Sequence, residues 1–126
     1  IPGTISDQMC MTMDFTFSMV TAAGQKPPND RPFDGMDILA HIITGQADKK
    51  RTLFWRARRG DNTRKAVRHG EWKYLWLQSG EKVEDYLFNL SSDPGEQNNV
   101  IKIEPTILRK LRQLLTKWEM NVKDSR

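Results

Sequence analysis

The residues best suited to chemistry in this chain are one cysteine and two histidines. Cys10 lies within Gln8-Met9-Cys10-Met11-Thr12, which contains no base that could activate a thiol. Free cysteine usually behaves as a small hydrophobic residue, so we interpret Cys10 as a buried structural thiol. His41 and His69 lack the spacing, to each other or to a carboxylate, that predicts a metal site, and we interpret both as structural.

A row of aromatic residues beside a basic segment offers a second kind of chemistry. Trp72, Tyr74 and Trp76 alternate along the chain and would share one face of a strand. The segment 49–73 holds ten Lys or Arg residues against two acidic ones, and aromatic faces beside cations can bind nucleic acid or another polyanion. A small sheet must also bury one face, and aromatic side chains fill such a core well. The pattern favours core packing and leaves polyanion or nucleic-acid binding as the alternative.

The composition bounds the class of protein. The chain has 126 residues, of which 37% are hydrophobic and 29% are charged, with a formal net charge of +4. These values are typical of one small soluble domain and exclude a disordered tail or a membrane-spanning segment. A single cysteine excludes an intramolecular disulfide and a cysteine-only zinc site. Because the chain opens on Ile1-Pro2-Gly3, without Met or a signal peptide, we expect it to come from inside a longer protein.

The first part of the chain, residues 1–47, is expected to form two short helices. Their predicted spans are 13–23 and 36–44, and a glycine follows each span. In the second helix the helical spacing of apolar residues predicts that four of them face a core: Ile38, Leu39, Ile42 and Ile43.

The second part, residues 48–126, has the pattern of a sheet followed by a helix. Alternating segments predict strands over 51–57, 65–68, 71–77 and 86–90. The polar segments 58–63 and 78–85 are predicted to be loops, and His69-Gly70 is predicted to be a tight turn. Pro105 begins a long helix whose apolar stripe would cover one face of the sheet. The predicted fold class is therefore α+β, a four-stranded antiparallel sheet packed against a long C-terminal helix.

Several short motifs, taken in order, carry a family resemblance. They are Ile1-Pro2-Gly3-Thr4-Ile5, Ala22-Ala23-Gly24, Phe33-Asp34-Gly35-Met36-Asp37-Ile38-Leu39, Val67-Arg68-His69-Gly70-Glu71-Trp72-Lys73 and Leu87-Phe88-Asn89-Leu90 followed by Asp93-Pro94-Gly95-Glu96. Each motif is weak alone, but their order over nearly the whole chain resembles the C-terminal part of a type I, arylsulfatase-like sulfatase. The resemblance implies the C-terminal subdomain of an alkaline-phosphatase-like sulfatase fold.

The resemblance also implies the chemistry of the longer enzyme to which this chain would belong, here called the parent. Members of the family hydrolyse sulfate esters with calcium and with a formylglycine made from Cys or Ser in a Cys/Ser-x-Pro-x-Arg motif. Cys10 is followed by Met11-Thr12-Met13 and does not match that motif. The family's calcium ligands and catalytic Lys and His residues belong to its large N-terminal domain. We therefore expect no catalytic residue, metal ligand or cofactor in this chain, and no activity from the chain alone.

The expected role is structural and substrate-cleft-shaping. The expected partners are the missing N-terminal sulfatase domain and a sulfate-ester substrate, whereas a membrane or nucleic acid is not expected. Polar and cationic residues of the two predicted loops are candidates for the rim of the cleft, since positive charge attracts a sulfated substrate. These candidates are Lys82, Gln78, Arg59 and Asn62. The alternative is that both loops are solvent-exposed hairpin ends without a ligand contact.

Two further expectations concern surface and compartment. Apolar residues near Met9, Phe17 and Met19 would face the missing domain, so the chain alone is expected to self-associate. The sequence itself indicates no compartment. The resemblance implies a periplasmic or secreted parent if the source is bacterial.

Overall fold

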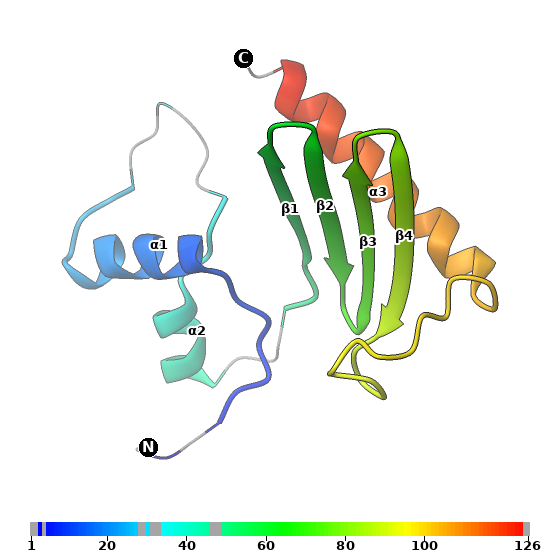
Figure 1. Ribbon diagram of the computed structural model, residues 1–126. Helices are drawn as coiled ribbons and strands as arrows, with labels where there is room; N and C mark the ends of the chain where they lie inside the picture. Colours follow the sequence, from blue (N-terminus) through cyan, green and yellow to red (C-terminus); the bar gives the residue numbers. More distant parts are fainter. Residues whose placement is uncertain (1–2, 4, 28–29, 31–33, 46–48, 125–126) are drawn as a thin grey trace. The chain divides into compact units, whose positions relative to one another are not determined.

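The computed structural model describes residues 3, 5–27, 30, 34–45 and 49–124, in two compact units. Unit 1 is Ile1–Lys49 and unit 2 is Lys50–Arg126. Unit 1 contains the helices α1 (Thr12–Ala22) and α2 (Ile38–Thr44). Unit 2 contains β1 (Thr52–Arg59), β2 (Asn62–His69), β3 (Trp72–Ser79), β4 (Lys82–Asn89) and α3 (Pro105–Asp124) (Figure 1). The α+β fold class predicted from the sequence is confirmed.

The sheet of unit 2 is a meander of equal strands. Its four strands have eight residues each and pair antiparallel in chain order. Two-residue turns join them, and each turn begins with a glycine at positive φ: Gly60 at 58°, Gly70 at 60° and Gly80 at 58°. A positive φ at the first turn position is typical of type II′ turns, whose twist matches that of the paired strands.

The two predicted polar loops are wrong, because most of their residues belong to strands. Within 58–63 and 78–85 only Gly60-Asp61 and Gly80-Glu81 form turns, and the remaining residues extend the sheet. The predicted turn at His69-Gly70 lies one residue later. Several of the extended strand ends are exposed, so no apolar alternation marks them in the sequence.

The core of unit 2 lies between the sheet and α3, which crosses one face of the sheet in Figure 1. Its fully packed members are Val67, Tyr74, Leu87, Leu111 and Leu115. Because alternate residues of a strand share a face, Val67, Tyr74 and Leu87 form one row across β2, β3 and β4. Leu111 and Leu115 of α3 pack on that row.

The aromatic row of β3 belongs to this core. Tyr74 is buried, and Trp72 and Trp76 are partly buried and pack against the same cluster. Core packing, which the sequence favoured, is therefore what the structure shows. The alternative of a polyanion-binding or nucleic-acid-binding platform built on Trp72, Tyr74 and Trp76 has no support, because Tyr74 is buried and the other two rings pack against the core.

A polar cluster joins the sheet to α3 beside the core. The Tyr74 hydroxyl donates to Asp85 Oδ2 at 3.1 Å, and Arg112 Nε donates to the Tyr74 oxygen at 3.2 Å. Arg112 also forms an ion pair with Asp85. Burial raises the pKa of the Tyr74 phenol, which keeps the hydroxyl protonated and able to donate. The cluster fixes where α3 lies along the sheet.

Unit 1 is held by a buried polar network. The side chains of Asp14 and Ser18 on α1 are 0% exposed. The Asp14 carboxylate accepts the backbone N–H of Met11 at 2.6 Å and that of Met36 at 2.9 Å. Ser18 Oγ accepts the backbone N–H of Ile38 at 2.8 Å. These hydrogen bonds tie α1 to the segment that leads into α2.

The same segment approaches α1 closely and caps α2. A Cβ at Gly35 would lie 2.5 Å from the Met13 carbonyl oxygen, so the contact requires glycine. Asp37 accepts the Ala40 N–H at 2.9 Å as the N-cap of α2 and accepts the Thr21 hydroxyl at 2.6 Å. These hydrogen bonds hold the pKa of Asp37 below its usual value.

Several apolar residues of the two helices are exposed, which corrects the prediction for α2. Of the four α2 residues expected in a core, only Ile38 is buried. The other three are exposed: Leu39, Ile42 and Ile43. Cys10 is also exposed, so its interpretation as a buried thiol is wrong.

Candidate functional site

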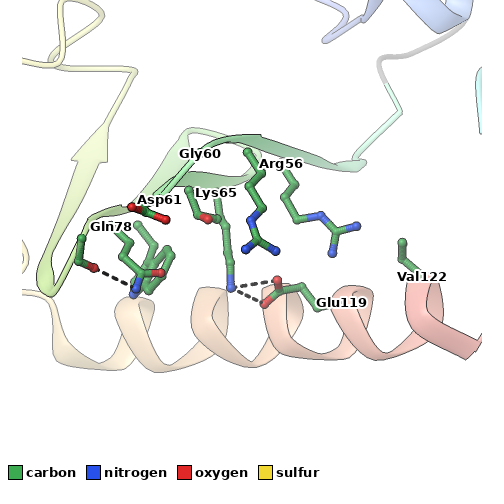
Figure 2. A pocket seen from close by; sticks show the side chains of 11 residues that line it. Arg56, Gly60, Asp61, Lys65, Gln78, Glu119 and Val122 are labelled. Atoms are coloured by element: carbon green, nitrogen blue, oxygen red, sulfur yellow. Dashed lines mark hydrogen bonds and ion pairs between the residues drawn. The ribbon is translucent and has the colours of Figure 1, made fainter.

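A cavity of about 890 Å³ lies in unit 2, between the turn end of the sheet and the last turns of α3 (Figure 2). We call it the hairpin-end cavity. Its walls come from β1, β2 and β3, from the turns at Gly60 and Gly80, and from Glu119 and Val122 of α3. The volume lies within the range of about 300–1,000 Å³ that is typical of small-molecule sites.

The strand register explains why these side chains converge. Two successive rows on the α3-facing side of the sheet form the floor: Arg56, Lys65 and Trp76, then Arg58, Thr63 and Gln78. They share a face with the core row because residues two apart on a strand point to the same side. The strands therefore continue beyond the apolar core. On the face of the sheet that packs against α3, the residues beyond the core are mostly polar.

The charges of the hairpin-end cavity are only partly balanced. Lys65 Nζ forms an ion pair with Glu119 at 2.8 Å and lies 4.4 Å from the centroid of the Trp76 ring. The Arg56 guanidinium lies 5.8 Å from the Trp118 ring of α3. Within the described ranges, neither Arg56 nor Arg58 has a carboxylate at ion-pair distance. The cavity thus holds two guanidinium groups that are free to bind an anion.

The four predicted rim residues are divided between the two faces of the sheet. Gln78 lines the hairpin-end cavity, where its Nε2 donates to the Gly80 carbonyl at 3.1 Å. Arg59 and Asn62 pair with each other and line a cavity of about 370 Å³ on the opposite face. Lys82 begins β4, and its ion pair with Glu84 at 3.0 Å raises the pKa of Lys82. The structure brings only Arg59 and Asn62 together.

Sequence reasoning missed Arg56 and Arg58 as cavity residues. A signal was present, because both residues continue the alternation that begins at Phe54, a partly buried residue that packs against the core. Gly60 and Gly80 also lie ten residues on either side of Gly70, which was recognised as a turn glycine. Three turn glycines at a spacing of ten residues indicate strands of about eight residues that reach Gly60 and Gly80. With that length, Arg56 and Arg58 fall on the same face as Phe54.

The residues first considered for catalysis lie elsewhere. His41 is buried in α2, and His69 Nδ1 lies 2.7 Å from Thr52 Oγ1 with its pKa lowered by burial. In the part of the chain that the structure describes, no group of three or more His, Cys, Asp or Glu residues could hold a metal ion. No described helix is long and apolar enough to cross a membrane.

Comparison with known proteins gives related sequences and a shared fold. No protein-family model matches the chain. The chain is 36% identical to mouse N-acetylgalactosamine-6-sulfatase over 83 residues, which are 64% of this chain and 15% of that protein. It is 30% identical to an uncharacterised sulfatase of Schizosaccharomyces pombe over 121 residues, which are 87% of this chain and 21% of that protein.

A solved structure shares the arrangement of helices and strands. A 2-O GAG sulfatase matches with a TM-score of 0.67 and 24% identity, over 88% of this chain and 25% of its own. The chain therefore spans about a quarter or less of each of these proteins. The sequence motifs, the fold and these relatives agree, and the chain is similar to the C-terminal region of the sulfatases.

Proposed function

We propose that this chain is the C-terminal part of a sulfatase, an enzyme that hydrolyses sulfate esters, and that its role there is structural and cleft-shaping. One observation carries the proposal: the similarity to sulfatases extends over 64–87% of this chain but over only 15–21% of those relatives. A match of that kind is expected of one region of a larger enzyme.

The catalytic groups are proposed to lie in a preceding segment. Calcium needs several oxygen ligands converging on one point, and among the described residues no three or more Asp, Glu, His or Cys side chains form a group that could hold a metal ion. Cys10 with Met11-Thr12-Met13 does not match the motif that yields formylglycine. The residues present do not fit either group, so we derive no catalytic step within this chain.

A carbohydrate sulfate is the proposed substrate class of the parent. The named relative is an N-acetylgalactosamine-6-sulfatase, and the structural neighbour is a GAG sulfatase. Both names specify sulfated sugars, and the arginines of the hairpin-end cavity are compatible with such anionic ligands.

The coding sequence upstream of Ile1 and two assays test the proposal. We expect a Cys/Ser-x-Pro-x-Arg motif in the same reading frame, and calcium-dependent release of sulfate from 6-sulfated N-acetylgalactosamine by the longer protein. The 126-residue chain alone should release none, because the nucleophile and the metal ligands are then missing. Turnover by the isolated chain, or a start codon directly before Ile1, would refute the proposal.

The apolar residues exposed on unit 1 are the proposed contact with the rest of the parent. Ile43 is 82% exposed and Met19 is 66% exposed, which is costly for two large apolar side chains in water. Phe17 and Met9, which were expected on the same surface, are half-buried.

We expect the isolated chain to self-associate through this surface. A variant with Met19→Lys and Ile43→Lys should therefore give a smaller mean mass in sedimentation and light scattering than the unchanged chain. Thr16→Lys together with Thr44→Lys adds the same charge at two exposed positions of the same helices and serves as the control. If the unchanged chain is a monomer at every concentration tested, this contact surface is wrong.

A further inference from the structure

We propose that the hairpin-end cavity binds a sulfated saccharide and that Arg56 and Arg58 hold one of its sulfate groups. The class of ligand rests on the proposed function. The site itself rests on the geometry of unit 2, in which strands, turns and the end of α3 line one open cavity.

The two arginines provide the anion-binding part of the site. They lie two residues apart on β1 and therefore on the same face, and both line the cavity. Figure 2 shows the Arg56 side chain extending from the strand toward α3, where the Trp118 ring lies 5.8 Å from its guanidinium. A guanidinium group donates two parallel hydrogen bonds to an oxyanion such as sulfate. Two such groups, both exposed on the same face of one strand, can bind one sulfate together.

Lys65 differs from the two arginines because its charge is already paired with Glu119. Because Glu119 lies 2.8 Å from Lys65 Nζ, that lysine is already neutralised. Arg56 and Arg58 have no such partner in the described part of unit 2, so an arriving anion would meet two uncompensated charges. Removing those two charges should therefore remove most of the attraction.

The remaining lining suits a sugar better than a bare anion. Trp76 contributes an aromatic surface, Gln78 an amide and Asp61 a carboxylate that can accept a hydroxyl. Inorganic sulfate would gain nothing from an aromatic surface and has no hydroxyl group to donate to Asp61. A nucleic acid would also be repelled by Asp61 and Glu119, since its backbone presents a regular series of negative charges. A saccharide with a single sulfate can use all of these groups.

Calorimetric titration of the 126-residue chain with 6-sulfated N-acetylgalactosamine, a sugar with a single sulfate, tests the site. The double variant Arg56→Gln, Arg58→Gln should bind at least about tenfold more weakly, the loss expected for two charge-assisted contacts. Arg64→Gln with Arg109→Gln changes the net charge by the same amount outside the cavity and should bind like the unchanged chain. Trp76→Leu should also weaken binding, because it removes the aromatic surface but no charge. Circular dichroism of each variant verifies that the fold is kept.

Several results would overturn the proposed site. Equal weakening in the control variant would show general charge attraction and overturn the site. The same conclusion follows if unsulfated N-acetylgalactosamine, inorganic sulfate or single-stranded DNA binds as strongly as the sulfated sugar, or if no sugar binds. These outcomes do not depend on turnover by the longer protein. An active parent enzyme with an unresponsive cavity would refute this inference alone, whereas an upstream region without sulfatase motifs would refute the proposed function alone.

Discussion

Replacement of Leu87 with alanine should lower the free energy of unfolding of unit 2 by about 2–5 kcal/mol. Leu87 is 0% exposed on β4 and belongs to the same buried cluster as Val67, Tyr74 and Leu111. Its neighbours come from both the sheet and α3, so they cannot all move to fill the cavity that truncation leaves. The lost contacts and the cavity both contribute to this large effect.

Urea unfolding followed by tryptophan fluorescence measures the effect of Leu87→Ala in unit 2 alone. All four tryptophans lie in that unit: Trp55, Trp72, Trp76 and Trp118. Ile103→Ala is the matched control, because Ile103 is a large apolar residue that is 72% exposed. The control should change the free energy of unfolding by less than about 0.5 kcal/mol. A similar small change for Leu87→Ala would contradict a core between the sheet and α3.

Asp14→Ala is expected to have the second large effect, and to have it in unit 1. The substitution removes the acceptor of two backbone N–H groups, those of Met11 and Met36. An unsatisfied donor costs about 1–3 kcal/mol when it is fully buried, and these two donors are partly buried, so the total is at most about 6 kcal/mol. That amount is comparable with the whole stability of a small compact unit, and we expect unit 1 to unfold.

Hydrogen exchange measured by mass spectrometry distinguishes the two units after Asp14→Ala. Peptides from α1 and α2 should lose protection, whereas those from β2 and β3 should keep it. Thr16→Ala changes an exposed residue of the same helix and should leave both patterns unchanged. Unchanged protection of α1 in the Asp14 variant would show that the buried network is not what holds unit 1 together.

The fold of unit 2 was predictable where residues contact its core. The alternation of Trp72, Tyr74 and Trp76 indicated a strand, and the apolar stripe after Pro105 indicated the covering helix. The strand ends around Gly60 and Gly80 were not predictable in the same way. They extend beyond the apolar core and carry polar side chains, so their pattern is that of loops.

In unit 1 the sequence pattern predicted the helix of α2 but not the burial of its residues. The apolar spacing in α2 correctly indicated a helix, yet Leu39, Ile42 and Ile43 are exposed. An apolar stripe indicates that a surface is apolar but does not identify what covers it. Asp14 is a residue type that caps helices, and it accepts the Met11 N–H, but its second hydrogen bond, from Met36, comes from 22 residues later and has no local signal.

The candidate site was predictable only in part. Gln78 was chosen as a rim residue and lines the hairpin-end cavity, but the two arginines that carry its charge were not chosen. The sequence does not distinguish a paired cation from an unpaired one. Lys65, beside the two arginines, is neutralised by Glu119, which lies 54 positions later in the chain. Pairing over such a distance depends on how α3 lies on the sheet, which local spacing does not specify.

The three two-residue turns also determine how unit 2 should fold. Every strand pairs with its neighbour in the sequence, so each hairpin closes a very short loop and loses little chain entropy. Sheets assembled from adjacent segments have a low contact order, and such domains fold faster than sheets with distant pairings. Individual hairpins form in roughly 1–10 μs. Unit 2 should therefore refold rapidly, with docking of α3 as the step that joins its most distant segments.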